Sequence, residues 1–313
     1  MNARSERLGG VALLIVATVM WGCMFPIGKP ILGRVDAFAI TFVRYGISAV
    51  AIAALLAVSE GRAAFATEGR PWRLAFFGVA GFCGFSLLAF SGLRLSSPAH
   101  GSVVVATLPL LTALIQGLRT RNWPASHTVT AMLLALSGVV LVVSNGHPAT
   151  LLASRSALGD AMILAGALCW AFYTLGARDF PHWSPLRYSA VTLLFGFGGI
   201  AVVCLMAFEA GATHVPSGAD LATAWPHLLF MALGASIIAV LSWNSGVRRL
   251  GPVNGALFIN VVPISTFAVE AIGGRMPSAW ELAGGALVIA ALLLNGLYRP
   301  RPVAMPRVCP DAA

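Results

Sequence analysis

The sequence predicts an all-α, polytopic membrane protein whose ten transmembrane helices form two inverted five-helix repeats. Three observations support this fold class: the composition, a series of ten apolar segments, and a motif that occurs twice. Of 313 residues, 58% are hydrophobic and 10% are charged, whereas a soluble domain carries about 25% charged residues. So few charged residues could not cover a water-soluble surface, and a disordered chain needs high charge and low hydrophobicity. Both classes are therefore excluded.

Ten apolar segments, each bounded by charged or turn residues, are predicted to cross the membrane. They span residues 8–27, 37–58, 74–92, 101–118, 129–143, 158–175, 188–208, 228–246, 253–272 and 282–298. Each is apolar around its whole circumference, which suits a buried or membrane-spanning helix, and none alternates between polar and apolar residues like a barrel strand. No small-residue cleavage site follows the first segment, so we expect a retained helix that also serves as the targeting signal.

The distribution of basic residues predicts the orientation in the membrane. With a cytoplasmic N-terminus, 14 basic residues fall in inside segments and 5 in outside loops. The inside group is Arg4, Arg7, Arg62, Arg70, Arg73, Arg119, Arg121, Arg178, Arg187, Arg248, Arg249, Arg299, Arg301 and Arg307, and the outside group is Lys29, Arg34, Arg94, Arg155 and Arg275. Since basic residues favour the cytoplasmic side, we predict an inner-membrane protein with both termini, including a basic tail at 299–313, in the cytoplasm. The charge of +9 is scattered singly, without the basic stripe that nucleic acid requires.

A repeated motif divides the chain into two halves. Ser91, Gly92, Arg94, Pro98, Gly101 and Pro109 recur in register as Ser245, Gly246, Arg248, Pro252, Gly255 and Pro263, each 154 positions later (91 to 245, for example). We therefore predict one repeat over 8–146 and a second over 157–298. Because each repeat holds an odd number of spans, the two copies must cross the membrane in opposite senses. Inverted repeats are typical of secondary transporters, which bind substrate between the halves near the bilayer midplane. A duplicated scaffold without transport is the alternative.

Further residues make the chain resemble a known family. They are Trp21-Gly22 and Phe25 in the first span, Arg44 in the second, Gly159-Asp160 and Trp170-Ala171 in the sixth, and Pro109 and Pro263 in the fourth and ninth. In this pattern the chain resembles the drug/metabolite transporter superfamily, in its EamA-type branch of ten-helix proteins. The resemblance implies a secondary carrier that exports amino acids or related small polar metabolites by alternating access, driven by the proton gradient. Uptake, nucleobase or drug efflux, and a non-transporting scaffold subunit stay open as alternatives.

The resemblance has one exception and one consequence for assembly. Members of the family often end the fourth and ninth spans with a Gly-Glu pair, where this chain has Arg121 and Gly274-Arg275. No role of that glutamate is therefore transferred to this chain. A homodimer through the fifth and tenth helices is the assembly that we consider.

Arg44 lies inside the second predicted span and is the first candidate site residue. A charge at the centre of a membrane helix costs about 2.5–3.5 kcal/mol on insertion scales, so its presence requires a reason. Two interpretations stay open. The side chain could reach outward or bind helix carbonyls as a structural group, or it could face the cavity and bind a substrate carboxylate through two hydrogen bonds.

Two carboxylates lie near the outer ends of spans. Asp160 fits the first turn of a helix, where N–H groups and the helix dipole favour negative charge. Glu270 could pair with Arg44 or face the outer headgroups. A proton-coupled carrier needs a carboxyl that alternates between its protonated and charged forms, which makes Glu270 the candidate for proton coupling.

Matching proline breaks and buried polar or aromatic residues complete the predicted site. Pro109 and Pro263 interrupt the fourth and ninth helices, and each releases the carbonyl four residues earlier. Such breaks point to a transporter's site, where free carbonyls could accept from an ammonium group, or they are plain kinks satisfied by neighbours. Trp21, Phe25, Trp170 and Tyr173 are predicted to form apolar walls or to serve packing, and Asn244 and Asn260 to line the cavity or to hydrogen-bond between helices.

The remaining chemistry of the sequence argues against an enzyme. The five cysteines form no C-x-x-C pair, and the sequence has no phosphate-binding glycine loop and no Ser/His/Asp or paired-carboxylate grouping. We expect no metal and no other cofactor, and the expected partners are a small-molecule substrate and the lipid bilayer. A carrier needs a polar cavity that reaches the midplane, whereas a scaffold would be packed shut.

Overall fold

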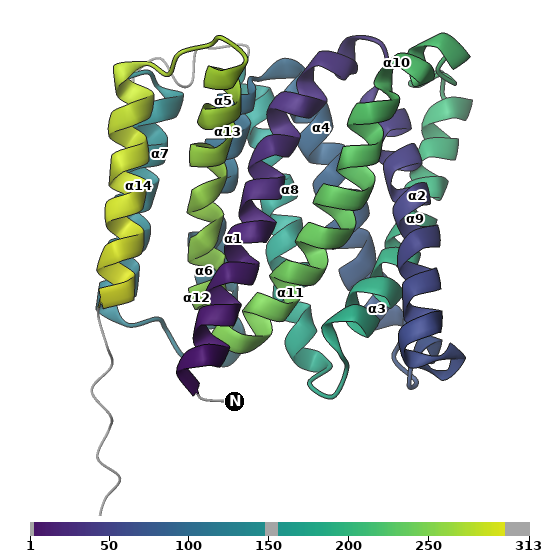
Figure 1. The fold of residues 1–313 in the computed structure, drawn as a ribbon, viewed down its shortest axis with the longest axis horizontal. Coiled ribbons are helices and arrows are strands. Elements are labelled where there is room, and N and C mark those ends of the chain that lie inside the picture. Colours follow the sequence, from purple (N-terminus) through teal and green to yellow (C-terminus); the bar gives the residue numbers. More distant parts are fainter. Residues whose placement is uncertain (1–2, 148–155, 298–313) are drawn as a thin grey trace, which may run out of the picture.

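The computed structural model describes residues 3–147 and 156–297, and every regular element within these ranges is a helix. The first half holds α1 (Ala3–Gly28), α2 (Ala37–Glu60), α3 (Pro71–Gly78), α4 (Phe85–Leu95), α5 (Pro98–Val105), α6 (Leu108–Thr120) and α7 (Ser126–Val143). The second half holds α8 (Ser156–Gly176), α9 (Pro185–Glu209), α10 (Gly218–Leu229), α11 (Ala239–Leu250), α12 (Pro252–Ala256), α13 (Val261–Ile272) and α14 (Ala279–Leu297). These helices stand side by side as one bundle (Figure 1).

Short helical turns join several of these helices into longer membrane-crossing segments. The π-helical turn η3 (Val79–Gly84) joins α3 to α4, and the π-helical turn η6 (Phe230–Ile238) joins α10 to α11. The 3-10 turn η7 (Leu257–Asn260) joins α12 to α13. Eight segments in the described ranges are long and apolar enough to cross a membrane, and Ser126–Val142 and Ala279–Ala291 are shorter apolar helices in the fifth and tenth positions. The predicted all-α, polytopic fold class is thus confirmed.

The eighth crossing segment begins earlier than the sequence predicted. It was expected from residue 228, but the helix starts at Gly218, where the hydroxyl of Ser217 accepts a hydrogen bond from the N–H of Asp220. The segment before residue 228 is amphipathic and contains Pro226, so it lacks the continuous apolar run that marks a span. A serine N-cap nevertheless satisfies its first N–H groups and allows the helix to extend.

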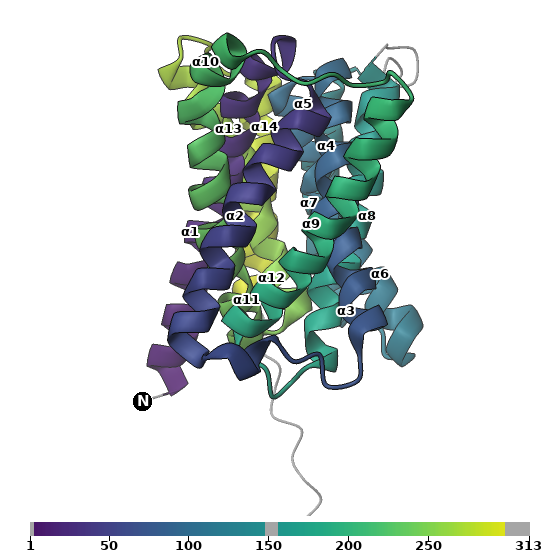
Figure 2. The same ribbon diagram turned by 90° about the vertical axis from the view of Figure 1, so that its right-hand side faces the viewer.

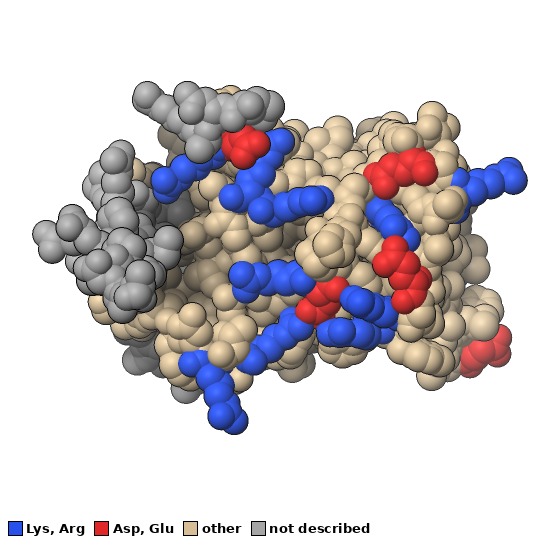
Figure 3. Space-filling model, turned by 90° about the horizontal axis from the view of Figure 1, so that it is seen from below, with Lys and Arg blue, Asp and Glu red and all other residues tan. Residues whose placement is uncertain are grey.

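The two halves cross the bundle in opposite senses. In Figure 1 the N-terminus lies at the lower end and α1 rises from it, whereas α8, the counterpart of α1 in the second half, runs downward from the upper end. Helix α2 and its counterpart α9 are likewise antiparallel and lie side by side (Figure 2). We call the end that holds the N-terminus the basic end, because Arg side chains gather there (Figure 3).

Contacts between the halves occur in equivalent pairs. Helix α1 packs against α11, and its counterpart α8 packs against α4, the counterpart of α11. In the same way α5 packs against α13 and α6 against α12, which pairs the two interrupted spans with each other. Helices α2 and α9 form one self-equivalent pair, and α7 and α14 form another. This approximate twofold arrangement buries the aromatic side chains of both halves in a common core.

Helices α7 and α14 approach closely because glycines face each other. A Cβ built on Gly138 would lie 2.5 Å from the carbonyl oxygen of Gly284, and one built on Gly284 would overlap the carbonyl oxygen of Gly138. Small residues of this kind let membrane helices pack backbone to backbone. The helices expected to mediate a homodimer are therefore already packed on each other within one chain, and the homodimer itself stays a prediction.

The single lysine of the chain serves a structural role at the end of the bundle opposite the basic end. Lys29, in the 3-10 turn η1 (Lys29–Gly33) after α1, donates from Nζ to the carbonyl oxygens of Leu93 and Ser96, both at 2.6 Å. These carbonyls belong to the last turn of α4 and to the residue that follows it, where a cation satisfies unpaired acceptors and the helix dipole. The contact ties the end of α1 to the end of α4.

The glycine contact gives a first prediction. Gly284→Leu should lower the free energy of unfolding by about 1–3 kcal/mol, because the added side chain meets backbone atoms of α7 that cannot move aside. Thermal unfolding in detergent measures the change. Gly285→Leu is the matched control, since a Cβ at Gly285 meets nothing within 4 Å. Equal unfolding midpoints for the two variants would contradict the close packing of α7 and α14.

Candidate functional site

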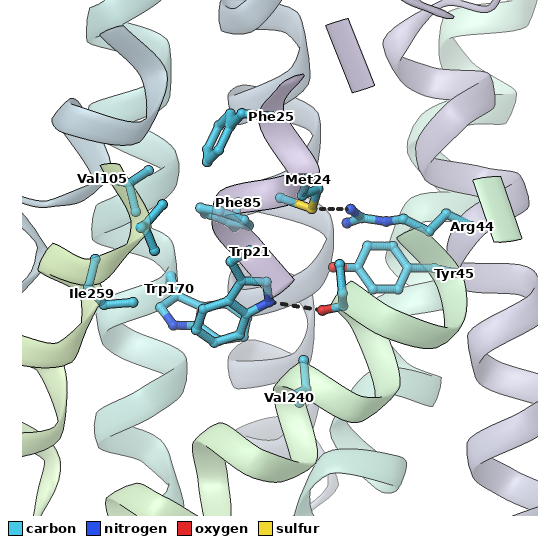
Figure 4. A pocket seen from close by; sticks show the side chains of 12 residues that line it. Trp21, Met24, Phe25, Arg44, Tyr45, Phe85, Val105, Trp170, Val240 and Ile259 are labelled. Atoms are coloured by element: carbon cyan, nitrogen blue, oxygen red, sulfur yellow. Dashed lines mark hydrogen bonds between the residues drawn. The ribbon is translucent and has the colours of Figure 1, made fainter. Parts of the chain in front are cut away.

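A small central cavity lies between the two halves, at the level of the helix breaks (Figure 4). Its lining residues are Trp21, Met24, Phe25, Arg44, Tyr45, Phe85, Val105, Trp170, Ala235, Val240, Ile259 and Val262. The cavity measures about 20 Å³, which is room for about one water molecule. An amino acid therefore cannot enter unless the surrounding side chains move.

Arg44 provides the one charged side chain of the cavity lining. Only 1% of the residue is exposed. Its Nη2 donates to the hydroxyl of Ser86 at 2.7 Å, and its Nη1 lies 3.0 Å from the sulfur of Met24. The guanidinium carbon lies 4.3 Å from the centre of the Tyr45 ring. These are neutral partners.

The guanidinium of Arg44 has no counter-charge in the described part of the chain. No carboxylate there lies within ion-pair distance, and Nε has no hydrogen-bond partner. A buried charge is stable only when it is paired or fully hydrogen-bonded. The cavity is thus electrostatically incomplete, and an anion would complete it.

Aromatic side chains form the floor of the cavity. The Trp21 ring lies 5.1 Å from the Trp170 ring and 5.2 Å from the Trp243 ring, centre to centre. The indole N–H of Trp21 donates to the carbonyl oxygen of Ala235 at 2.8 Å. Ala235 belongs to the π-helical turn η6, which also presents the carbonyl of Ala232 to the hydroxyl of Ser48 at 3.0 Å. The irregular turn thus provides acceptors that side chains of the first half use.

A polar cluster lies below this aromatic floor. The amide nitrogen of Asn244 donates to the hydroxyls of Tyr173 and Ser189, each at 2.7 Å, and its amide oxygen has no partner. The hydroxyl of Tyr188 donates to the carbonyl of Tyr173 at 2.8 Å, and the two tyrosine rings are stacked 5.3 Å apart. These residues connect α8, α9 and α11 where the second half faces the basic end.

A larger hollow, which we call the vestibule, opens from this cluster toward the basic end. It measures about 260 Å³. Its lining residues are Thr174, Ala177, Arg178, Phe180, Pro181, Trp183, Ser184, Pro185, Tyr188, Asn244, Val247, Arg248, Gly251 and Pro252. Arg178 and Arg248 are its charged residues, so the vestibule lining is positively charged.

Four aromatic residues separate the vestibule from the central cavity. We call Trp21, Trp170, Tyr173 and Trp243 the aromatic barrier. The Tyr173 ring lies 4.8 Å from the Trp170 ring, and the indole N–H of Trp243 donates to the hydroxyl of Thr174 at 3.2 Å. From the basic end inward, the order is therefore the vestibule, the polar cluster, the aromatic barrier and the cavity that Arg44 lines. Every residue that lines the vestibule belongs to the second half of the chain.

Comparison with known proteins identifies the family. The chain matches the EamA-like transporter family over residues 8–144 and again over 157–297. The chain belongs to this family. It is a membrane transporter rather than an enzyme.

Individual relatives of this EamA-family chain extend over nearly its whole length. It is 35% identical over 298 residues to an uncharacterized transporter, YrdR, of Bacillus subtilis (strain 168), covering 93% of this chain and 92% of that protein. It is 28% identical to the aromatic amino acid exporter YddG of Ancylobacter novellus, covering 93% and 96%. It is 23% identical to a probable terminal-alkyne amino-acid exporter of Streptantibioticus cattleyicolor, covering 90% and 91%. One solved crystal structure shares the fold, with a TM-score of 0.72, 20% identity, and coverage of 95% of this chain and 98% of that one.

Four of the residues predicted from the sequence meet at the cavity of this family member. Trp21, Phe25, Arg44 and Trp170 line it together. Tyr173 belongs to the aromatic barrier and Asn244 to the polar cluster. Sequence reasoning missed Tyr45 and Trp243, although Tyr45 directly follows Arg44 and Trp243 directly precedes Asn244. The signal in the sequence that could have identified these two residues was their position directly beside Arg44 and Asn244.

The prolines and Asn260 lie beside the cavity rather than in its lining. Pro109 and Pro263 fall in the first turns of α6 and α13, directly after the breaks in the fourth and ninth spans. Val105 and Ile259, four residues before each proline, do line the cavity. Asn260 is fully buried, and neither atom of its amide has a partner among the described residues. Its unsatisfied amide is a second polar group next to the cavity.

Glu270 and Asp160 lie away from the cavity, at the opposite end from the vestibule. The carboxylate of Glu270 is 3.1 Å from a guanidinium nitrogen of Arg275, which also pairs with Glu281. Its ion-pair partner is therefore Arg275 rather than Arg44. Asp160 accepts from the hydroxyl of Ser96 at 2.5 Å and lies 3.3 Å from the His100 ring. Asp160 is the fifth residue of α8 and lies beyond its first turn, so the predicted helix-start role is wrong; its contacts are instead with α5 and the residue after α4. The part of the chain that the structure describes holds no cluster of three or more metal-binding side chains.

Replacing the buried charge separates the two interpretations of Arg44. Without substrate, Arg44→Met should raise the free energy of unfolding by about 1–4 kcal/mol, because an apolar side chain of similar length removes an unpaired buried charge. Thermal unfolding in detergent is the measurement, with exposed Arg94→Met as the control that should change little. A structural arginine would give the reverse result, a lower unfolding midpoint for Arg44→Met.

Proposed function

We propose that the protein exports small carboxylate-bearing metabolites of the amino-acid class, with apolar or aromatic side chains, across the inner membrane by alternating access. The observation that carries this proposal is the guanidinium of Arg44, buried without counter-charge in an aromatic cavity between the two halves. A carboxylate can accept two parallel hydrogen bonds from a guanidinium. In an apolar cavity this contact replaces the missing counter-charge.

The rest of the cavity fits the remainder of such a substrate. Trp21, Trp170 and Phe85 offer apolar and aromatic walls to a side chain. A substrate ammonium group has the faces of the same indole rings and the carbonyl of Ala235 as partners. The names of two relatives, an aromatic amino acid exporter and a probable terminal-alkyne amino-acid exporter, agree with this class.

The direction of transport follows from the proposed orientation. Basic residues favour the cytoplasmic side, so we propose that the basic end and its vestibule face the cytoplasm. Arg178 and Arg248 line this vestibule, and positive charge in a cleft raises the local concentration of anionic groups. Substrate would therefore enter from the cytoplasm, and displacement of the aromatic barrier would admit it to Arg44.

Counterflow in liposomes tests the substrate class and the role of Arg44. Purified protein is assayed with a panel of amino acids, nucleobases and cationic drugs. We expect exchange of aromatic and apolar amino acids, and at least a tenfold loss in Arg44→Ala, because the carboxylate loses a charge-assisted pair worth about 2–5 kcal/mol. Arg44→Lys should recover little of this activity, since an ammonium lacks the two-pronged geometry.

The control for this assay is Arg94→Ala, an exposed arginine outside the cavity, which should exchange substrate like the parent protein. Equal exchange of amino acids by both Arg44 variants and the parent would refute the binding role. Exchange confined to nucleobases or cationic drugs would refute amino acids as the substrate class and assign that other class. If no compound is exchanged, the result would favour a scaffold without transport.

We further propose that the proton gradient drives export, with Glu270 as the coupling carboxyl. Its ion pair with Arg275 at 3.1 Å is broken by protonation, so the contact can alternate with pH. Glu270→Gln should leave counterflow intact but abolish uphill transport driven by an imposed pH gradient. Glu209→Gln, an exposed carboxyl at the end of α9, is the control. Uphill transport by Glu270→Gln at the parental rate would assign coupling to another group.

A further inference from the structure

A groove on the outer surface of the bundle has no role in the pathway between the halves. It lies between α3, α6 and α8 at the basic end and measures about 520 Å³. Its lining residues are Arg73, Phe77, Ile115, Leu118, Arg119, Phe172, Leu175 and Asp179. Leu118 is 67% exposed and Phe172 is 36% exposed, so the groove opens to the surroundings of the bundle.

The groove has an apolar part and a charged part. Phe77, Ile115, Leu118, Phe172 and Leu175, one or two from each of the three helices, form the apolar walls. Arg73, Arg119 and Asp179 form the charged end. This division matches a molecule that carries a hydrocarbon chain at one end and an anionic group at the other.

One carboxylate organises the charged end. The side chain of Asp179 accepts from Arg73 at 2.5 Å through one oxygen and from Arg119 through the other. Its backbone carbonyl accepts from Arg70 at 2.9 Å, and Arg178 lines the adjoining hollow together with Arg119. Two guanidiniums thus bind one carboxylate, and the charged end formed by Arg73, Arg119 and Asp179 has a net charge of +1.

The arginines retain donors that point away from Asp179. The side chains of Arg73 and Arg119 are 52% and 43% exposed, whereas that of Asp179 is 10% exposed. In the described part of the chain, Arg73 and Arg119 each use one nitrogen for Asp179, and their other nitrogens have no protein partner. Asp179 therefore holds the two guanidiniums side by side, with N–H groups directed to the exterior.

The position of the cluster suits the boundary between hydrocarbon and headgroups. Trp72 at the start of α3 is 86% exposed, and Trp123 after α6 is 59% exposed. Exposed tryptophans at span ends are typical of the membrane interface. At this level the arginines meet phosphates, while the apolar walls extend into the acyl-chain region.

We propose that this groove binds one anionic phospholipid. The phosphate accepts from Arg73 and Arg119, as guanidiniums bind phosphate, and an acyl chain lies along Phe77, Ile115 and Phe172. Basic pockets between membrane helices at the cytoplasmic side bind anionic headgroups by the same physics. A zwitterionic lipid would bring an ammonium group to a charged end that is already net positive, and a free phosphate would leave the apolar walls unfilled. The proposal is independent of the transported substrate.

Native mass spectrometry of the purified full-length protein tests the proposal. The probes are phosphatidylglycerol, phosphatidylcholine with the same chains, and glycerol 3-phosphate as a headgroup without chains. We expect one tightly bound phosphatidylglycerol, bound at least tenfold more tightly than phosphatidylcholine and not displaced by glycerol 3-phosphate. The double variant Arg73→Ala/Arg119→Ala should weaken phosphatidylglycerol binding at least tenfold.

Two further variants make the test specific. Arg7→Ala/Arg62→Ala removes two exposed arginines from the same end outside the groove, and it should bind phosphatidylglycerol like the parent. Ile115→Trp fills the apolar part and leaves every arginine in place, so it should also weaken binding, even if the double arginine variant does not fold. Thermal unfolding without added lipid reports whether each variant is intact.

Three results would overturn the proposal. One is parental affinity for phosphatidylglycerol in both groove variants. Another is equal affinity of the parent for phosphatidylcholine, which would remove charge as the basis of binding. The third is displacement of the lipid by glycerol 3-phosphate at an equal concentration, which would make the groove a site for small anions.

Discussion

The packing of two antiparallel halves is the constraint on which the rest of this structure depends. In a bilayer every backbone group must be satisfied within the protein, so each half offers only helices, and helices gain stability there by close packing. Because the halves are related by an approximate twofold axis, each contact between them, such as that of α1 with α11, has an equivalent in α8 with α4. Broken helices are tolerated where these contacts converge. The central cavity lies at that place.

The cavity combines a closed space with an unbalanced charge. Its size, about 20 Å³, reflects close packing of Trp21, Trp170 and Trp243, while Arg44 has only neutral partners. Tight packing favours the empty state, and the uncompensated guanidinium disfavours it. Two opposing terms of this kind allow an anionic ligand to change the balance between conformations, because a ligand shifts an equilibrium by its difference in affinity for the two states. Under the proposed function, Arg44 would contribute to such a shift through its neutral surroundings.

Much of this arrangement could be predicted from the sequence because it depends on periodic and local signals. Apolar segment length gave the spans, and the repeated Ser-Gly-x-Arg motif gave the opposite orientation of the halves. Charge and aromatic residues inside spans identified Arg44, Trp21, Phe25 and Trp170 as cavity residues. These signals are strong because a membrane interior restricts which residues it accepts.

The remaining features depend on rotations and on loop geometry that a pattern does not encode. The π-helical turns η3 and η6, which place Phe82 and Ala235 in the core, alter the helix register and contain no proline. Glu270 pairs with Arg275 because the turn after α13 folds back, which the spacing of the two residues alone does not require. The start of α10 at Gly218 depends on one serine cap. Trp243 joined the aromatic barrier through contacts with the first half, far away in the chain.

The single lysine has a consequence for observing the molecule at work. Lys29 donates to the carbonyls of Leu93 and Ser96, so its amine should react more slowly with an acylating reagent while α1 and α4 are in contact. No other lysine side chain in the sequence competes for that reagent. The labelling rate of this lysine should therefore follow the separation of these helices, without any engineered cysteine or fluorophore.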